Sequence, residues 1–171
     1  MKIISQSQAE TKRIAKMFVK DMLKKEKRRS AVVLCLEGDL GVGKTTFTQG
    51  FAKGLGVRGK ILSPTFVILK KFQIPKTKPY TLLVHHSFNE GGSGGGNPTP
   101  YKYFFHIDCY RLKSEKDLIA LGIKEIIKNP ENILLIEWPE RIRKILPKEA
   151  MKIQFEHSKT AKERIITIAI K

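Results

Sequence analysis

The chain has 171 residues, with 33 Lys and Arg against 16 Asp and Glu, which gives a net charge of +17. This length suits one domain built on a single sizeable core, so we expect one domain over residues 1–171. No apolar stretch approaches the roughly 20 residues needed to cross a bilayer. Residues 1–6 lack the apolar segment of a secretory signal. We therefore expect a cytoplasmic protein and exclude the membrane and secreted classes.

The hydrophobic pattern alternates between strand-like and helix-like segments along the chain. Strands are expected at residues 3–4, 31–36, 66–72, 80–86, 101–107, 132–136, 151–156 and 164–170. Helices are expected at residues 8–25, 46–55 and 114–121, the last capped by Ser114. Such alternation predicts an α/β fold: a three-layer sandwich of the P-loop NTPase type, whose mixed sheet has a parallel core and antiparallel additions.

The segment between residues 36 and 46 carries the strongest motif. It reads G-x-x-x-x-G-K-T, the phosphate-binding P-loop, with a strand before it and a helix after it. In that context backbone N–H groups and the positive end of the helix dipole point at one anion site. Lys44 can reach the β- and γ-phosphates, and the Thr45 hydroxyl can bind Mg²⁺. The expected nucleotide-binding residues of the loop are Gly38, Asp39, Leu40, Gly41, Val42, Gly43, Lys44, Thr45 and Thr46.

Two acids follow hydrophobic strands, as a metal-assisted phosphoryl reaction requires. Glu137 ends the strand at residues 132–136, and Asp108 ends the strand at residues 101–107. Carboxyl ends of parallel strands converge, so either acid can face a metal beside Thr45. The alternatives are a surface Glu at a strand end and an Asp that caps or pairs with Arg111. His106 alternates with neighbours on the opposite face, and we interpret it as a packing histidine, not a base.

Several other features have more than one interpretation. Trp138 is either a core side chain or part of a contact surface that senses the nucleotide state. Residues 63–66 follow the P-loop helix, where other P-loop hydrolases keep a segment that senses the γ-phosphate. Cys35 and Cys109 are interpreted as small core side chains, with neither a disulfide nor a zinc site.

A Gly-rich stretch, residues 89–100, interrupts the pattern. It has no apolar anchor and no Lys-Ser/Thr ending, so we expect a flexible hairpin insertion around residues 87–100 and not a second phosphate loop. Basic residues cluster at residues 24–29 and are spread elsewhere. The charge is read either as a solvated surface or as a contact with nucleic acid, and tRNA contact stays open.

Taken together, these segments resemble the TsaE (YjeE) family. The resemblance is carried, in order and spacing, by Thr11, Gly38 to Thr46, Ser63-Pro64-Thr65-Phe66, His106-Ile107-Asp108-Cys109-Tyr110-Arg111-Leu112, Leu121-Gly122 and Ile136-Glu137-Trp138-Pro139-Glu140. Members are bacterial P-loop ATPases required to make threonylcarbamoyladenosine (t6A) in tRNAs that read codons starting with A.

The resemblance implies an ATPase that uses Mg²⁺ and works on a complex of TsaD and TsaB, where ATP hydrolysis resets the machinery. Because no arginine is clearly placed to complete the site, we expect the protein to be slow alone and to be accelerated by these partners. It implies that Lys44 and Thr45 bind ATP and Mg²⁺, that Asp108 and Glu137 are the functional acids, and that Thr11 lies near the nucleotide. Trp138 becomes a functionally sensitive aromatic residue. The long hairpin from residue 73 to residue 100 and the strong positive charge depart from the family pattern.

Two other function classes use some of the same residues. A small-molecule or nucleotide kinase also uses a P-loop, but such enzymes carry an Arg-rich lid, and only Arg141 and Arg143 form a close pair after Glu137. A nucleic-acid-binding module could hold a nucleotide as a structural ligand, and the salt dependence of tRNA binding would reveal it.

Overall fold

The computed structural model describes residues 1–24, 29–64, 66–76, 100–158, 160 and 163–169. Its strands are β1 (Lys2–Ser5), β2 (Val32–Glu37), β3 (Leu69–Gln73), β4 (Tyr103–Asp108), β5 (Asn132–Glu137), β6 (Met151–His157) and β7 (Arg164–Ile168). Its helices are α1 (Gln8–Leu23), α2 (Lys44–Gly54), α3 (Glu115–Ala120), α4 (Ile123–Lys128) and the 3-10 helix η2 (Pro139–Ile145).

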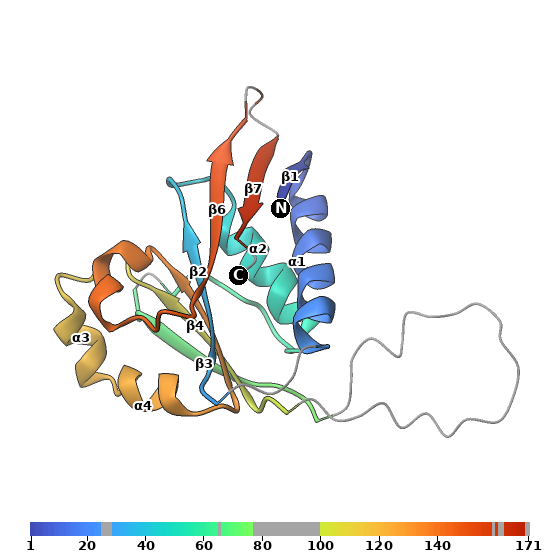
Figure 1. The fold of residues 1–171 in the computed structure, drawn as a ribbon. Helices are drawn as coiled ribbons and strands as arrows, with labels where there is room; N and C mark the ends of the chain where they lie inside the picture. Colours follow the sequence, from blue (N-terminus) through green and yellow to red (C-terminus); the bar gives the residue numbers. More distant parts are fainter. Residues whose placement is uncertain (25–28, 65, 77–99, 159, 161–162, 170–171) are drawn as a thin grey trace, which may run out of the picture.

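Within these residues one seven-stranded sheet has the order β1-β7-β6-β2-β5-β4-β3. The four strands β6, β2, β5 and β4 pair in parallel. Antiparallel pairs add β3 beside β4 on one edge, and β7 and then β1 beside β6 on the other. Helices α1 and α2 cover one face, and α3, α4 and η2 lie on the other (Figure 1). The expected α/β fold with a parallel core and antiparallel additions is confirmed.

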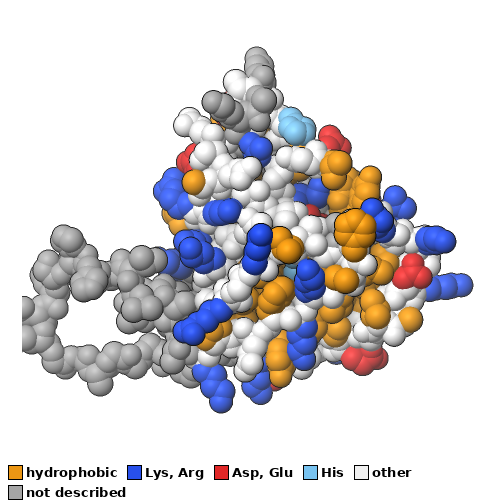
Figure 2. All heavy atoms as spheres, turned by 180° about the vertical axis from the view of Figure 1, so that it is seen from behind, with side chains coloured by type: hydrophobic (Ala, Val, Ile, Leu, Met, Phe, Trp, Pro, Cys, Tyr) orange, Lys and Arg blue, Asp and Glu red, His pale blue; other side chains and the backbone are white. Residues whose placement is uncertain are grey.

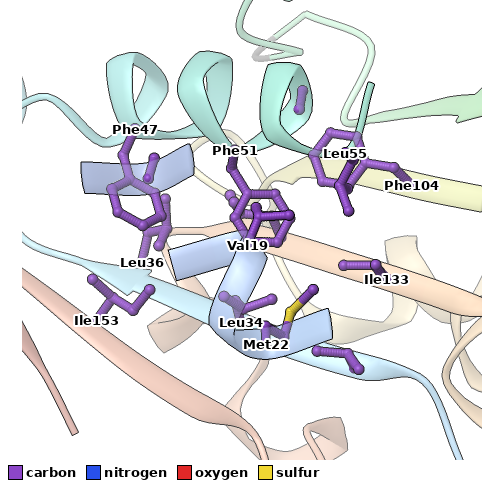
Figure 3. Close-up of a cluster of buried hydrophobic side chains, with 14 of the residues drawn as sticks. Val19, Met22, Leu34, Leu36, Phe47, Phe51, Leu55, Phe104, Ile133 and Ile153 are labelled. Carbon is purple, nitrogen blue, oxygen red and sulfur yellow. The ribbon is translucent and has the colours of Figure 1, made fainter. Parts of the chain in front are cut away.

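The face under α1 and α2 buries the larger core. Phe47, Phe51 and Leu55 point from α2 and its end toward Leu34 and Leu36 of β2 (Figure 3). Strand alternation explains the division, because even-numbered residues of β2 face this core whereas Val33 and Cys35 face the core under α3 and η2. Strand β2 is therefore packed between helices on both faces of the sheet. This packing fixes the position of the P-loop that follows it.

Helix α1 packs closely on α2. Its N-cap is Ser7, whose hydroxyl accepts a hydrogen bond from the backbone N–H of Glu10 at 3.1 Å. Gly50 of α2 lies against the backbone of Lys12, so close that an added Cβ would lie 2.5 Å from its Cα. A glycine at this position lets the two helix backbones touch.

Some expected elements differ from those observed. The strand expected at residues 66–72 begins only at Leu69, because Val67 and Ile68 donate backbone hydrogen bonds to Pro64 in a turn, with Ile68 at φ +63°. Helices α4 and η2 were not predicted. The strand expected at residues 80–86 and nearly all of the insertion expected around residues 87–100 lie outside the described residues.

Candidate functional site

The P-loop connects the end of β2 to the start of α2. Gly43 is the N-cap of α2 and has φ +100°, a left-handed conformation that favours glycine. Gly38, at φ +132°, faces the backbone carbonyl of Phe155 so closely that any Cβ would collide with it. These glycines let the loop turn tightly, and the first N–H groups of α2 are left to bind an anion.

A cavity of about 370 Å³ opens beside this loop. Its volume is in the range of small-molecule sites, about 300–1,000 Å³. It is lined by Leu40, Gly41, Gly43, Lys44, Thr45, Thr46, Ser63, Asp108, Tyr110, Glu137 and Trp138. Six of the nine loop residues expected to bind nucleotide, and both acids, therefore face one space. Of the other three, Gly38 and Asp39 contribute their carbonyl groups to Lys44, and Val42 is buried in the core.

Lys44 is buried at the floor of this cavity. Its Nζ donates hydrogen bonds to the carbonyl oxygens of Gly38 at 2.6 Å and Asp39 at 2.7 Å. It also lies 3.9 Å from the centre of the Trp138 ring, a cation–π contact. Burial lowers the pKa of Lys44, while nearby carboxylates, Glu137 first among them, act in the opposite direction. The carbonyl groups of the loop thus hold the ammonium group at the cavity.

Glu137 is the acid closest to the P-loop helix. The hydroxyl of Thr45 donates to its two carboxylate oxygens, at 3.2 and 3.1 Å. The hydroxyl of Thr48, one turn further along α2, donates to the Lys44 carbonyl at 3.0 Å and lies 3.5 Å from Glu137 Oε1. Glu137 is only 3% exposed. The Glu137 carboxylate and the Thr45 hydroxyl are therefore in direct contact. Two hard oxygen ligands placed side by side in this way suit a divalent cation.

His106 also contacts Glu137, which the interpretation as a packing residue missed. Its Nε2 lies 2.8 Å from Glu137 Oε1 and donates to it, and the histidine is fully buried. His106 does lie on the face opposite to Phe105 and Ile107, as expected. That face, however, is the one that α2 covers, so His106 is next to the carboxylate. Its Nδ1 has no partner within the described part of the chain.

Asp108 ends β4 directly beside Glu137 in the sheet register. Its Oδ2 accepts a hydrogen bond from the Ser63 hydroxyl at 2.8 Å, and its Oδ1 accepts one from the backbone N–H of Tyr110 at 3.0 Å. Asp108 as a whole residue is 3% exposed. These contacts tie the segment after α2 to the acid at the end of β4. The side chain of Arg111, considered as a partner of Asp108, stacks on the Phe66 ring with a separation of 4.3 Å.

Trp138 forms a wall of the cavity and is partly buried. Its ring contacts both Lys44 and Tyr110, and the centres of the Trp138 and Tyr110 rings are 5.1 Å apart. Its backbone is left-handed, with φ +58° and ψ +51°. Such a conformation costs about 1–2 kcal/mol for a residue other than glycine. The sequence left open whether Trp138 is a core side chain or part of a contact surface. The ring packs against the core and also lines the cavity, so it belongs to the site itself.

The chain is similar in sequence to known proteins. A sequence model of the family described as Threonylcarbamoyl adenosine biosynthesis protein TsaE matches residues 5–89 and 96–166. The chain belongs to the TsaE family. It is 30% identical to the tRNA threonylcarbamoyladenosine biosynthesis protein TsaE of Haemophilus influenzae, over 85% of this chain and 75% of that protein. The TsaE of Bacillus subtilis is 33% identical, over 81% of this chain and 70% of that protein.

The fold also agrees with that of a solved structure. The crystal structure of Bacillus subtilis YdiB has a TM-score of 0.64 and 30% identity, and covers 98% of this chain and 83% of that one. The described residues include no helix that is long and apolar enough to cross a membrane. They also include no cluster of three or more His, Cys, Asp or Glu that could hold a metal. A Mg²⁺ ion keeps most of its waters and needs only one or two protein carboxylates, so Thr45 and Glu137 fit it.

Thr11, expected near the nucleotide from the TsaE resemblance, is buried and does not line the cavity. Its hydroxyl lies 2.8 Å from the hydroxyl of Ser5 and donates to the Ser7 carbonyl at 3.1 Å. Ser5 pairs with Arg164 across β1 and β7. Thr11 therefore links the start of α1 to β1. Strand β1 lies at the edge of the sheet opposite to the strands that end in Asp108 and Glu137.

Both cysteines are buried, as expected for core side chains, and both are free thiols. Burial raises the pKa of the Cys35 thiol to about 12 and that of Cys109 above its ordinary value. Neither thiol is suited to nucleophilic chemistry, and their packing role is confirmed.

Proposed function

We propose that the protein binds ATP with Mg²⁺ in this cavity and hydrolyses it as the ATPase subunit of tRNA t6A biosynthesis. Membership of the TsaE family supports the pathway. The observation that carries the chemistry is the contact of the Thr45 hydroxyl with the Glu137 carboxylate, directly beside Lys44. When bound, Mg²⁺ neutralises charge that develops on the transferring phosphoryl group.

The residues of the chain divide the work between them. The N–H groups of the loop and the Lys44 ammonium hold the phosphates. Glu137 receives its orientation from Thr45 and His106, so its oxygens point at the position beside the helix hydroxyl. Asp108, held by Ser63, orients the attacking water near the terminal phosphate.

The P-loop function is tested by Lys44→Ala, with Lys53→Ala as a matched control on the same helix. Lys53 is exposed near the far end of α2. Titration with a fluorescent ATP analogue should show binding lost in Lys44→Ala and unchanged in Lys53→Ala, with equal circular dichroism spectra. Unchanged affinity in Lys44→Ala would remove the P-loop from the proposal.

The finer proposal is that the protein is slow alone and is accelerated by TsaD and TsaB. Among the described residues no arginine lines the cavity, and phosphoryl transfer without one is slow. A partner that supplies or orders a cation can add about 10³–10⁵ in rate. Trp138 lies at the cavity wall beside Glu137, where such a partner would be sensed.

Phosphate release should therefore be measured for the protein alone, with TsaD–TsaB, and for Trp138→Ala with TsaD–TsaB. We expect a slow rate alone, acceleration by the partners, and weakened acceleration in Trp138→Ala. A fast rate that partners do not change would favour the kinase alternative, in which the phosphoryl group passes to a small molecule.

The net charge of +17 also supports direct contact with tRNA. Lys and Arg side chains are spread over the face in Figure 2 and interspersed with hydrophobic ones. If this surface contacts tRNA, the binding occurs through phosphate neutralisation, and its affinity falls steeply as salt rises. Filter binding of tRNA at low and physiological salt tests it, and an affinity that salt does not change would exclude this contact.

A further inference from the structure

Helix α1 carries a row of lysines on one side. Lys12, Lys16 and Lys20 follow one another at intervals of four residues, so they start about 6 Å apart along the helix axis. Lys53 of α2 adds a fourth ammonium group close to them, because a Cβ built on its neighbour Gly54 would lie 3.2 Å from the Cα of Lys16. All four side chains are exposed or half-buried. These four residues form what we call the lysine row.

The protein does not neutralise the lysine row itself. The two acidic side chains of α1 pair with other cations, Glu10 with Arg13 at 3.2 Å and Asp21 with Lys24 at 3.0 Å. Within the described part of the chain, no carboxylate forms a salt bridge with any member of the row. The row therefore presents a line of positive charge that a polyanion can neutralise.

A basic amphipathic helix can also lie on a membrane surface, but that role needs a free apolar face. The apolar face of α1 is not free, because Ile14, Ala15, Val19 and Met22 are buried in the core. Among the large apolar side chains of α1, which the structure describes in full, Met17 is the exposed one. The helix uses its apolar side for folding, so the lysine row offers a partner charge alone.

Given the tRNA contact proposed above, on which this step rests, we infer that the lysine row binds the phosphate backbone of tRNA. A row of evenly spaced cations matches a row of evenly spaced phosphates, and neutralising the phosphates releases counterions. Lysine is a flexible point charge, which suits contacts that position an RNA strand without reading its bases. The basic side chains in Figure 2 are interspersed with hydrophobic ones, whereas the lysine row is continuous along α1.

The lysine row leaves the nucleotide cavity open. None of its four members, all described residues, lines that cavity. Lys53 lies in the last turn of α2, whereas Lys44, at the cavity, is the first residue of the same helix. Bound tRNA would therefore lie away from the P-loop, and loss of the row should not weaken ATP binding.

The row is tested by one variant that combines Lys12→Gln, Lys16→Gln and Lys20→Gln. Glutamine forms helices about as well as lysine, so α1 should stay folded. Fluorescence anisotropy of labelled tRNA measures binding between about 50 and 200 mM salt. The slope of log affinity against log salt should become shallower by about 3, roughly one for each lost phosphate contact. ATP affinity and the circular dichroism spectrum should stay at the wild-type values.

The matched control combines Lys116→Gln, Lys124→Gln and Lys128→Gln. These lysines are exposed on α3 and α4, which lie on the other face of the sheet, so the same net charge is removed at a different place. The control should keep the wild-type slope. An equal change of slope in both variants, or a wild-type slope in the first, would overturn the inference in favour of a general effect of net charge.

Two further measurements complete the test. Lys16→Gln alone should lower the slope by about 1, which keeps the inference open to refutation if the triple variant does not fold. Poly-glutamate offers the same charges on a protein backbone, and a triple variant that loses affinity for it but not for tRNA would assign the row to an acidic protein. A wild-type protein that binds no tRNA would refute the proposed tRNA contact, whereas one that binds tRNA through the row but no ATP would refute only the ATPase proposal.

Discussion

Gly50 offers a sharp test of how closely α1 and α2 must pack to hold the site. In the substitution Gly50→Ala, the new Cβ would lie 2.5 Å from the Cα and 2.5 Å from the carbonyl oxygen of Lys12. Both atoms belong to the backbone of α1 and cannot turn aside as a side chain could. The helices must therefore separate by about 1 Å, which disturbs a close-packed core.

Two opposing free energies decide the outcome. Alanine is favoured over glycine in a helix interior by about 1 kcal/mol. Overpacking a core costs about 1–3 kcal/mol, and the rigid backbone of Lys12 places Gly50→Ala at the upper end. The net loss is about 2 kcal/mol of unfolding free energy, which lowers the Tm of a domain this size by about 4–8 °C.

Thermal unfolding followed by circular dichroism measures this loss, with Gly54→Ala as the matched control. At Gly54 an added Cβ would meet the side chain of Val19 at 3.1 Å and the Cα of Lys16 at 3.2 Å, contacts that a small shift relieves. Gly54→Ala should stay within about 1 kcal/mol of the wild type. A Tm for Gly50→Ala at or above the wild-type value would refute the close packing of α1 on α2.

Three further predictions concern the site and the thiols. Glu137→Gln and Asp108→Asn should each lose phosphate release far more than affinity for fluorescent ATP, and normal release in the assembled complex with TsaD–TsaB would show that the acids are misassigned. His106→Phe should slow phosphate release roughly tenfold, the effect of one misoriented carboxylate, with ATP affinity unchanged; an equal fall in affinity would indicate general loss of structure. Cys35 and Cys109 should resist maleimide at about pH 8 when folded and react when denatured. Because their raised pKa keeps them protonated in the folded state, the unfolding free energy should also fall as pH rises above the ordinary thiol pKa, and a rise there would contradict this sign.

The convergence of Lys44, Thr45, Asp108 and Glu137 was predictable from sequence. Each acid ends a run of buried-type residues, and parallel strands bring such ends to one edge of the sheet. The role of His106 was not predictable. The alternation of side chains along a strand shows that His106 faces away from Phe105, but it does not show which helix covers that face. Only the packing of α2 on that face reveals the contact with Glu137.

Arg164 shows a second limit of sequence reasoning. A Cβ built on Gly43 would lie 3.1 Å from the Cδ of Arg164, so this side chain lies beside the P-loop. That position depends on β6 pairing in parallel with β2 and on β7 pairing antiparallel with β6. Both strands were expected, but a hydrophobic pattern does not give their order in the sheet. The turn at Ile68 was missed for a different reason, since an isoleucine with positive φ goes against its own conformational preference.

The site concentrates its connections on one carboxylate. Glu137 ends β5, accepts from Thr45 of α2 and is bonded to His106 of β4, so three elements meet at its two oxygens. The next residue, Trp138, has a left-handed backbone and carries its ring to the cavity wall against Lys44. Any contact that shifts this ring therefore acts on the lysine directly and on the carboxylate through a single peptide bond. Under the proposed function, this short path is the route by which a partner that contacts Trp138 would change the rate of a reaction whose groups are otherwise buried.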